Sequence, residues 1–359
     1  KDVAGLIAVL EGDDPTRAGD AATSLLELAD PASVEPLIAI IEADPFSSAA
    51  GHAVEILTAI GDERAVPAII SVLETTPPAS ARSRVERYEQ PAAIAALAEF
   101  ADPRAAEPIV AWVRENGAPL GVADDEKAVV DDALLAIGSG SVEPLIELAA
   151  DDKAPSSARN WAVRLLGDIG EPAAAPALIE LLSGARVIQD SVLAALAELG
   201  TGALDALLAG LKSDDWVVVS YSAKALGQIG DKRAEADLLT LMTSNADKAD
   251  VRNARLAASD ALALINKDDP ARLLDWLGAR ETVLIYYGLI HLGMPETEAA
   301  LLEAFDRHAD KVMAEHYLNS GNAALSGAAK KWAEANGFDV MTFSNLPGGE
   351  TAWGSLGDE

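Results

Sequence analysis

An internal repeat constrains this chain more than any other feature. Helical stretches rich in Ala and Leu end at a glycine, and a second apolar stretch begins a few residues later. The segments LTAIGDERAVPAIISVL, LGDIGEPAAAPALIELL and LGQIGDKRAEADLLTLM show this unit three times with different surface residues. The helix stops fall at Gly61, Gly138, Gly170, Gly200 and Gly230. A recurring unit of this length indicates a repeat protein.

Each unit is predicted to be a pair of antiparallel helices. Apolar residues recur at the spacing of one helix face on both sides of the stop. In one unit they are Ala53, Ile56, Leu57 and Ile60, then Val66, Ile69, Ile70 and Leu73. Gly61 suits the left-handed position that ends a helix, Pro67 suits the first turn of the next, and Ala29 and Ala101 occupy the stop position elsewhere. Such a hairpin has apolar surface on both sides, so about eight or nine hairpins are expected to stack into an α-solenoid.

The unit resembles a known family. Residues 53–73 follow the consensus A-x-x-A-L-x-x-I-G-D-x-R-A-V-P-A-L of the short HEAT-like repeats named after phycobilisome lyase subunits. The resemblance covers roughly residues 20–265 and implies an all-α fold, an α-solenoid of HEAT-like hairpins. It implies no single function, because such repeats serve as scaffolds in unrelated settings.

The resemblance also implies an Asp in the turn between repeats and an Arg at the start of the next helix. The matching pairs are Asp14 with Arg17, Asp152 with Arg159, and Asp250 with Arg252. The unit that follows Asp214 and Asp215 departs from this pattern with the sequence WVVVSYS. A continuous Asp and Arg ladder is therefore not expected there.

One branch of the family, the deoxyhypusine hydroxylases, binds two irons through His-Glu pairs. None of the four histidines, His52, His291, His308 and His316, is followed by Glu, so the resemblance does not extend to that activity. His308, Glu315 and His316 are predicted to share one helix face, too far apart for a single metal. We predict no metal and no other cofactor.

Two charged clusters need interpretation. Acidic residues flank a long insert, and calcium favours several oxygens that converge from a flexible loop. They are Asp124, Asp125, Glu126, Asp131 and Asp132. Without alternating Asp and Asn spacing, a solvated helix start is favoured over a calcium site. The basic residues Arg82, Arg84 and Arg87, beside Tyr88, are predicted to fold back on the chain's own solenoid rather than to contact an acidic partner.

The net charge restricts the classes of partner. The chain carries 58 acidic and 27 basic residues, a formal charge of −31. A field of this sign repels phosphate backbones, so nucleic acid is not an expected partner. The abundance of Asp, Ala, Val and Gly is typical both of a protein adapted to high salt and of an ordinary acidic protein, and we expect the cytoplasm of a salt-adapted microorganism.

Motifs for chemistry and targeting are scarce. The chain has no cysteine, which excludes disulfides and thiolate chemistry. Phosphate-binding loops, nucleophile elbows and H-E-x-x-H motifs are missing. We expect no membrane span. The start at Lys1 rather than Met is compatible with a leader that has been removed.

The C-terminal third differs in composition from the repeats. It holds nine of the sixteen aromatic residues: Trp276, Tyr286, Tyr287, Phe305, Tyr317, Trp332, Phe338, Phe343 and Trp353. This enrichment is typical of a divergent cap that covers the last repeat and also of an aromatic recognition surface. We predict a solenoid over residues 1–266, a divergent cap over 267–338 and an extended acidic tail over 339–359.

These features favour a non-enzymatic scaffold that binds a partner protein of unknown identity. The second helices are expected to line a concave binding face, with Glu35, Glu107, Trp112, Arg114, Glu143, Glu180, Lys212 and Glu235 near it. The residues predicted to bind are Trp112, Arg114, Glu143, Glu180, Tyr287 and Trp353. Two alternatives stay open: a lyase-like enzyme or enzyme subunit that handles a chromophore or acceptor protein, and a structural component of a surface or filament assembly.

Overall fold

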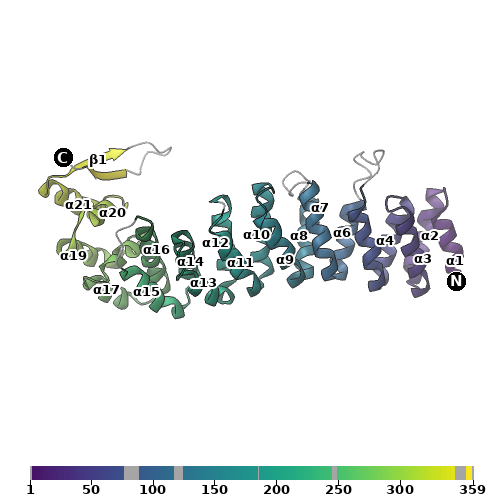
Figure 1. Cartoon of the computed structure of the whole chain (residues 1–359), viewed down its shortest axis with the longest axis horizontal. Helices are drawn as coiled ribbons and strands as arrows, with labels where there is room; N and C mark the ends of the chain where they lie inside the picture. The colour runs from purple at the N-terminus through teal and green to yellow at the C-terminus, as the bar shows by residue number, and fades with distance from the viewer. Residues whose placement is uncertain are drawn as a thin grey trace. The chain divides into compact units, whose positions relative to one another are not determined.

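The computed structural model describes residues 2–76, 89–116, 124–184, 186–244, 249–343 and 353–357. The chain forms two compact units, residues 1–178 and 179–359, and both are built from paired helices (Figure 1). The division falls inside helix α11 (Ala175–Leu181). The compositional change predicted at residue 267 lies inside unit 2, so the repeats from residue 179 onward and the C-terminal third pack as one compact body.

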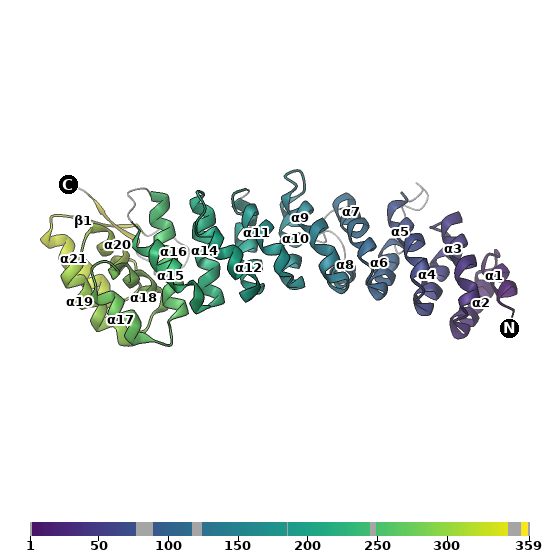
Figure 2. The same cartoon turned by 60° about the horizontal axis from the view of Figure 1, so that its bottom comes forward.

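Unit 1 is a two-layered stack of helical hairpins. Its helices are α1 (Val3–Leu10), α2 (Pro15–Leu28), α3 (Val34–Ala43), α4 (Ser48–Ile60), α5 (Val66–Glu74), α6 (Glu89–Phe100), α7 (Ala106–Asn116), α8 (Asp124–Ile137), α9 (Val142–Ala150) and α10 (Ser156–Ile169). Even-numbered helices pack against one another in one layer and odd-numbered helices in the other (Figure 2). The apolar stripes predicted from the repeat face inward, since Ile56, Leu57, Val66 and Ile69 are fully buried.

Unit 2 continues the hairpin pattern through the C-terminal third. Its helices after α11 are α12 (Gln189–Glu198), α13 (Leu204–Gly210), α14 (Trp216–Ile229), α15 (Glu235–Thr243), α16 (Ala249–Ile265), α17 (Pro270–Gly278), α18 (Tyr286–Leu292), α19 (Glu298–His308), α20 (Lys311–Leu318) and α21 (Ala323–Ala335). The first helices α12, α14, α16 and α18 pack side by side. The predicted α-solenoid of HEAT-like hairpins is thus confirmed.

Many turns between helices are short 3₁₀ helices that run directly into the next helix. These are η1 (Pro31–Ser33), η2 (Glu63–Ala65), η4 (Pro103–Ala105), η5 (Gly138–Ser141), η6 (Pro172–Ala174), η7 (Arg186–Ile188), η8 (Gly200–Ala203), η9 (Lys232–Ala234), η10 (Val283–Ile285) and η11 (Pro295–Thr297). The next helix is the second helix of a hairpin except after η7 and η10, where it is the first helix of the next hairpin. At η2, the Asp62 carboxylate accepts the backbone N–H of Arg64 at 3.0 Å and pairs with its guanidinium at 2.6 Å. The side-chain hydrogen bond with Arg64, together with the backbone one, lowers the pKa of the Asp62 carboxyl. The same Asp and Arg pairing recurs at η4 and η9 and lowers the pKa of the aspartate there too.

The helix stops have the left-handed backbone that the sequence predicted. Gly61 has φ +71° and Gly230 has φ +75°, and each donates its N–H to the helix before it. Ala29 and Ala101 adopt the same region, with φ +43° and +49°. Among the described residues these two alanines are the non-glycine positions with positive φ.

The predicted Asp and Arg ladder forms only in part. The Arg159 side chain is buried, donates from Nε to the Ala149 carbonyl at 2.8 Å and pairs with Asp152 at 3.2 Å. Arg255, rather than the predicted Arg252, plays the matching role by donating to the Met242 carbonyl at 2.9 Å. These side chains cap the end of the preceding helix, which would otherwise leave carbonyl groups without donors.

Asp14 has a local role instead. Its Oδ1 accepts the backbone N–H groups of Thr16 and Arg17 and so caps α2. A short polar side chain at this position satisfies donors that have no partner inside the helix. The predicted pair of Asp14 with the Arg17 side chain is therefore replaced by a backbone cap. The side chain of Asp250 and the basic segment Arg82–Tyr88 lie outside the described residues.

Close contacts between helices set the spacing of unit 2. A Cβ atom at Gly227 in α14 would lie 2.7 Å from Cα of Ala261 in α16. A Cβ at Gly288 in α18 would lie 2.4 Å from the carbonyl oxygen of Ser259 in α16. Real Cβ atoms do not approach other atoms so closely, so both contacts require glycine. The buried Ser259 hydroxyl donates to the Leu284 carbonyl at 2.8 Å and accepts the Gly288 N–H at 3.0 Å.

Aromatic side chains of the C-terminal third contribute to the core of unit 2. Phe305 and Tyr317 are buried, and their rings stack with centroids 4.6 Å apart. The Tyr317 hydroxyl donates to the Leu301 carbonyl at 2.9 Å. Trp332 stacks on Phe338 with centroids 5.7 Å apart. The predicted role of this third as a cap for the last repeat stays a prediction.

The chain end differs from the predicted extended tail. Strands β1 (Asp339–Phe343) and β2 (Trp353–Gly357) form an antiparallel pair in which Phe343 lies opposite Trp353. β1 contacts α21 and β2 contacts α20. The run VMTF favours a strand because β-branched and aromatic residues suit a pleated surface. Pairing of the two strands also satisfies backbone groups that an extended tail leaves to water.

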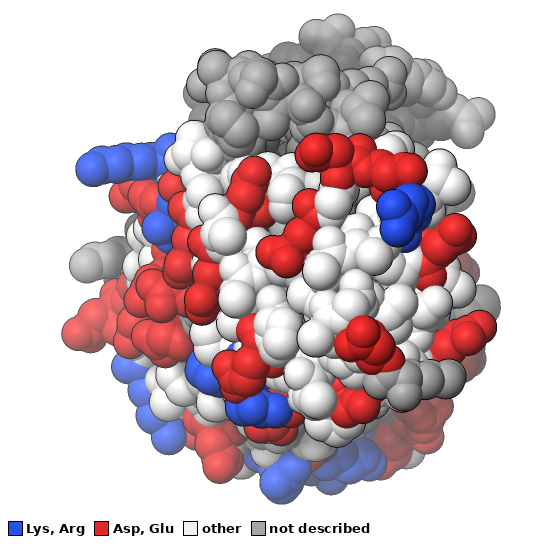
Figure 3. Space-filling model, turned by 90° about the vertical axis from the view of Figure 1, so that its right-hand side faces the viewer, with Lys and Arg blue, Asp and Glu red and all other residues white. Residues whose placement is uncertain are grey.

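Acidic side chains are spread over the surface. Figure 3 looks at the end of unit 1 that carries the N-terminus, where acidic side chains surround an uncharged central area. A shallow depression at this end is lined by Asp2, Leu6, Glu27 and Leu28. The ion pairs in the described residues are mostly exposed, and an exposed pair contributes little to stability.

One helical stretch is long and apolar enough to cross a membrane, which the sequence analysis did not expect. Within the described residues it is Ala128–Ala150. It consists of α8 and α9 joined by η5, and Leu134 and Leu145 on it are buried against the solenoid. By length and composition alone, it is weak evidence for a membrane span.

The left-handed alanines generate a test of the helix-stop assignment. We expect Ala29→Gly and Ala101→Gly each to raise the free energy of unfolding by about 0.5–1 kcal/mol, because relief of left-handed strain exceeds the added freedom of the unfolded chain. Thermal melting of each variant measures this. The matched control is Ala59→Gly at an exposed helical position of α4, which should lower stability by about 1 kcal/mol. Destabilisation by all three changes would contradict the assignment.

Candidate binding groove

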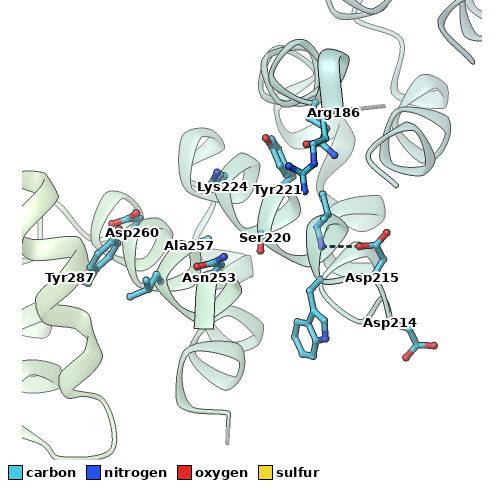
Figure 4. Close-up of a pocket in the computed structure, with 14 residues that line it drawn as sticks. Arg186, Asp214, Asp215, Ser220, Tyr221, Lys224, Asn253, Ala257, Asp260 and Tyr287 are labelled. Atoms are coloured by element: carbon cyan, nitrogen blue, oxygen red, sulfur yellow. Dashed lines mark hydrogen bonds between the residues drawn. The ribbon is translucent and has the colours of Figure 1, made fainter. Parts of the chain in front are cut away.

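A groove of about 670 Å³ crosses the outer surface of the first helices in unit 2. It runs over η7, α12, α14, α16 and α18, so several consecutive hairpins contribute to it (Figure 4). Its lining includes three aromatic rings, three carboxylates, two cations and two amides. They are Trp216, Tyr221 and Tyr287; Asp214, Asp215 and Asp260; Arg186 and Lys224; and Asn253 and Gln189. The Gln189 amide donates to the Leu182 carbonyl.

Helix α14 supplies the aromatic middle of the groove because its two faces differ. Asp215 caps the helix by accepting the Val217 N–H at 2.8 Å, the dashed bond in Figure 4. Val218 and Val219 then point into the core and are buried. Trp216 and Val217 face the groove, and Val217 keeps 40% of its surface exposed. The segment that broke the Asp and Arg pattern thus forms the groove floor.

Tyr221 and Lys224 form a polar and aromatic pair one turn further along α14. The Tyr221 hydroxyl donates to Oδ1 of Asp190 at 3.2 Å, and Lys224 Nζ lies 4.7 Å from the centre of the Tyr221 ring. Burial, together with the nearby Asp190 charge, raises the pKa of the Tyr221 hydroxyl. The hydroxyl therefore stays neutral and is held in place from both sides.

The other end of the groove is built around Tyr287 on α18. Its ring lies edge-on to the rings of His291 and His316, with centroids 4.2 and 4.8 Å away. His291 Nδ1 lies 2.8 Å from Oδ1 of Asp260, which itself lines the groove. The hydrogen bond that Asp260 accepts from His291 raises the pKa of His291, because the carboxylate favours the protonated imidazole. Tyr287 is half-buried and offers one ring face and edge for contact.

His316 lies behind Tyr287 and behaves in the opposite way. Burial, with a smaller contribution from the nearby His291, lowers its pKa to about 4. The hydroxyl of Tyr286 lies 2.8 Å from Nδ1 of His316. Burial raises the pKa of Tyr286, so the neutral hydroxyl donates to the neutral imidazole. Two histidines on neighbouring elements thus have pKa values shifted in opposite directions.

The predicted binding residues are not brought together. Tyr287 is the one that lines the groove. In unit 1, Trp112 Nε1 donates to Gln90 at 2.9 Å, Arg114 pairs with Asp151 at 3.8 Å, and Glu143 is exposed. In unit 2, Glu180 is exposed on α11, and the side chain of Trp353 lies outside the described residues.

The other predicted residues of the second helices mostly form surface ion pairs. Glu35 pairs with Arg64 at 2.7 Å, Lys212 pairs with Asp237 at 3.9 Å, and Glu235 pairs with Arg272. Glu107 is exposed. A concave binding face lined by second helices therefore stays a prediction, whereas the larger groove that the structure describes lies on first helices.

The metal hypotheses were tested against the described residues, where no group of three or more His, Asp or Glu side chains converges. His308 ends α19, whereas Glu315 and His316 lie on α20, so the predicted shared helix face does not exist. Of the acidic cluster, Asp131 accepts from Trp161 Nε1 and from Arg164 at 2.7 Å each. The side chains of Asp124, Asp125 and Glu126 lie outside the described residues.

Sequence reasoning missed Trp216, Tyr221, Lys224 and Asp260 as groove residues. The sequence held a signal for Trp216, because it stands where the unit before Gly170 carries Ser156, whereas Tyr221 stands where that unit already has the aromatic Trp161. Lys224 and Asp260 carry no such signal. In the sequence they are ordinary polar helical positions, and only the packing of α14 beside α16 brings them together in the groove.

Comparisons with known proteins agree with the fold. Residues 3–89 match the HEAT repeats, and residues 158–184 and 218–244 match the PBS lyase HEAT-like repeat. The resemblance predicted from the sequence is therefore confirmed. No curated protein is significantly similar to the chain.

Three solved structures are similar at low identity. Human deoxyhypusine hydroxylase in complex with glycerol is 21% identical, over 73% of this chain and 96% of that chain, with a TM-score of 0.28. The complex of CpcE and CpcF of phycocyanin lyase from a Nostoc species is 19% identical, over 80% and 93%, with a TM-score of 0.27. Importin beta is 16% identical, over 92% of this chain and 48% of that chain, with a TM-score of 0.30. At these values the likeness concerns the repeat fold and carries no statement about activity.

The opposite pKa shifts predict a specific dependence of stability on pH. Between pH 6.5 and about 4, the unfolded chain binds a proton at His316 that the folded chain does not, so acidification should lower stability. After allowance for solvent screening of this partly exposed side chain, the loss is of the order of 2 kcal/mol. Melting midpoints across this range should fall less steeply in His316→Gln, which keeps an acceptor for Tyr286.

His291→Gln is the control with the opposite sign. The pKa of His291 is raised in the folded state, so its stabilisation is complete below pH 6.5 and is lost as the pH rises through the folded value. This variant should still lose stability on acidification below pH 6.5, but its stability should no longer decline as the pH rises above 6.5. Identical pH profiles for the parent chain and His316→Gln would contradict the assignment.

Proposed function

We propose that the protein is a non-enzymatic interaction scaffold that binds a partner protein in the groove over α12, α14, α16 and α18. The observation that carries the proposal is the row of accessible aromatic rings, Trp216 and Tyr221 on α14 and Tyr287 on α18, with α16 between these two helices. Trp and Tyr dominate the energetics of protein interfaces because each offers a large contact area together with a polar atom. The partner contacts this row.

The form of the groove supports a protein ligand. It is open to solvent and shared by several hairpins, whereas small molecules bind in concave sites that bury most of their surface. Repeat proteins bind extended segments along such surfaces because successive hairpins present similar positions at regular spacing. The partner is therefore a protein segment that lies across the helices rather than a compact ligand.

The charges of the groove support selectivity. Arg186 and Lys224 supply positive charge to the groove, and Asp214, Asp215 and Asp260 supply negative charge. An interface that carries both signs steers and orients its partner, and it penalises the wrong one. The strongly acidic surface elsewhere discourages non-specific association of acidic proteins.

The polar groups of the groove are engaged in pairs that hold side chains in place. Asp215 caps α14, Asp260 pairs with His291, and the Tyr221 hydroxyl donates to Asp190. An enzyme needs a nucleophile, a base and a charge-stabilising group that converge on one position. The paired arrangement therefore supports binding over catalysis. The lyase-like alternative requires such converging catalytic groups, whereas the structural alternative does not.

Substitution of groove aromatics tests the proposal. We expect Trp216→Ser and Tyr287→Ser each to reduce capture of the native partner by about tenfold or more, since buried interface aromatics contribute about 2 kcal/mol or more. Both residues are partly exposed, so the melting midpoint should change by only a few degrees. The measurement is quantitative affinity capture with the full chain from cells of the source organism, at two salt concentrations.

Trp276→Ser on the second helix α17 is the matched control. Trp276 is also partly exposed and has the same side chain, but it lies outside the groove. Capture should survive this change. The proposed face would be wrong if a captured protein stayed bound to both groove variants but was lost with Trp276→Ser. Turnover or covalent retention of a chromophore by the purified protein would favour the lyase-like alternative.

A further inference from the structure

A second, smaller cavity of about 330 Å³ shares Leu256 on α16 with the groove, but none of the three groove aromatics lines it. It is enclosed by α16, η10, the end of α19 and the start of α20. One part of its wall carries Arg252, Arg255, His308 and Asp310. The other part is apolar.

Two guanidinium groups line this cavity without a carboxylate partner among the described residues. Arg252 and Arg255 lie three residues apart on α16, which places them on one helix face. Neither forms an ion pair with the described residues, whereas most other described arginines do, among them Arg64, Arg104 and Arg164. In a chain with 58 acidic and 27 basic residues, two neighbouring arginines without an ion pair to the described residues are unexpected, because like charges at this spacing repel.

Arg255 is held in place by its neighbour in the repeat. Its Nε donates to the carbonyl of Met242 at 2.9 Å, as Arg159 donates to Ala149 in unit 1. Arg159, however, also pairs with Asp152, and Arg255 has no such partner among the described residues. Its Nη groups make no hydrogen bond with the described residues, and Arg255 lines the cavity.

A third polar group at the cavity lacks a partner. His308 Nε2 is buried and makes no hydrogen bond with the described residues. A buried polar atom in this state is costly unless a partner fills the space beside it. Asp310, the carboxylate among the described wall residues, accepts the Met313 N–H with its Oδ1 at 2.8 Å as the cap of α20.

We propose that this cavity binds a small amphipathic anion. A carboxylate or phosphate head lies against Arg252 and Arg255, since guanidinium groups match the geometry of such oxyanions. His308 Nε2 donates to a second oxygen of the head. The apolar body of the ligand packs on Leu256, Val283 and Met313. The volume is near the lower end of the range for small-molecule sites, about 300 Å³, which suits a ligand with one ring or a short chain.

Isothermal titration calorimetry on the full chain tests the site with benzoate, phenyl phosphate and inorganic phosphate as probes. We expect benzoate or phenyl phosphate to bind with one site per chain, and inorganic phosphate to bind at least about tenfold more weakly because it lacks the apolar body. The head group that the site prefers is identified by comparing the affinities of benzoate and phenyl phosphate. Inorganic phosphate that binds as tightly as phenyl phosphate would overturn the amphipathic ligand.

Variants separate this site from general attraction of anions. Arg252→Gln and His308→Gln should each weaken binding of the preferred probe by about tenfold. Arg280→Gln is the matched control, because Arg280 is exposed, belongs to the same unit and forms no ion pair with described residues, yet lies outside the cavity. It should bind like the parent chain. No heat of binding from any probe at about 10 mM, or equal loss in Arg280→Gln, would overturn the proposal.

Folding of the variants is checked independently. Arg252 is exposed and makes no hydrogen bond that packing depends on, so Arg252→Gln should melt within a few degrees of the parent chain. The preferred probe should raise the melting midpoint of the parent chain and of Arg280→Gln, but not that of Arg252→Gln. A probe that stabilises all three equally binds elsewhere, which contradicts the assignment.

Discussion

Close stacking of the first helices α14, α16 and α18 is the contact on which unit 2 depends. Gly227 and Gly288 allow backbone to approach backbone, and Ser259 fastens α16 to the start of α18 with one donated and one accepted hydrogen bond. A hairpin with apolar surface on both sides has no other means of burying it. Because the helices are fixed at short range, side chains on their outer face, such as Tyr287, are held on rigid elements.

The scarcity of basic residues makes their positions informative. Arg64, Arg104 and Arg233 clamp aspartates at the hairpin turns, and Arg159 closes the end of a neighbouring helix. These roles serve the fold of each repeat. Arg186 and Lys224 in the groove and Arg252 in the smaller cavity form no ion pair with the described residues, although the chain is rich in carboxylates. This agrees with the binding of a partner and of a ligand that we propose.

The repeat itself was predictable, and the site was largely not. Helix stops such as Gly61, and even the left-handed Ala29, follow from local backbone chemistry and are visible in the sequence. The groove depends on which faces of α14, α16 and α18 meet, and single exposed residues such as Lys224 give no signal of that. Tyr287 was found because aromatic enrichment is a local signal. The strand pair at the chain end was missed because a two-stranded pairing depends on contacts with α20 and α21.

Hydrogen–deuterium exchange of the protein with and without its captured partner tests the central claim most directly. If the partner lies across the first helices of unit 2, amide exchange should slow in peptides that cover residues 214–224, 253–260 and 286–291, where the groove aromatics and carboxylates lie. Peptides from the second helices of unit 1, including those with Trp112 and Glu143, should exchange as in the free protein. Protection confined to those second helices, with none over the groove, would contradict the account.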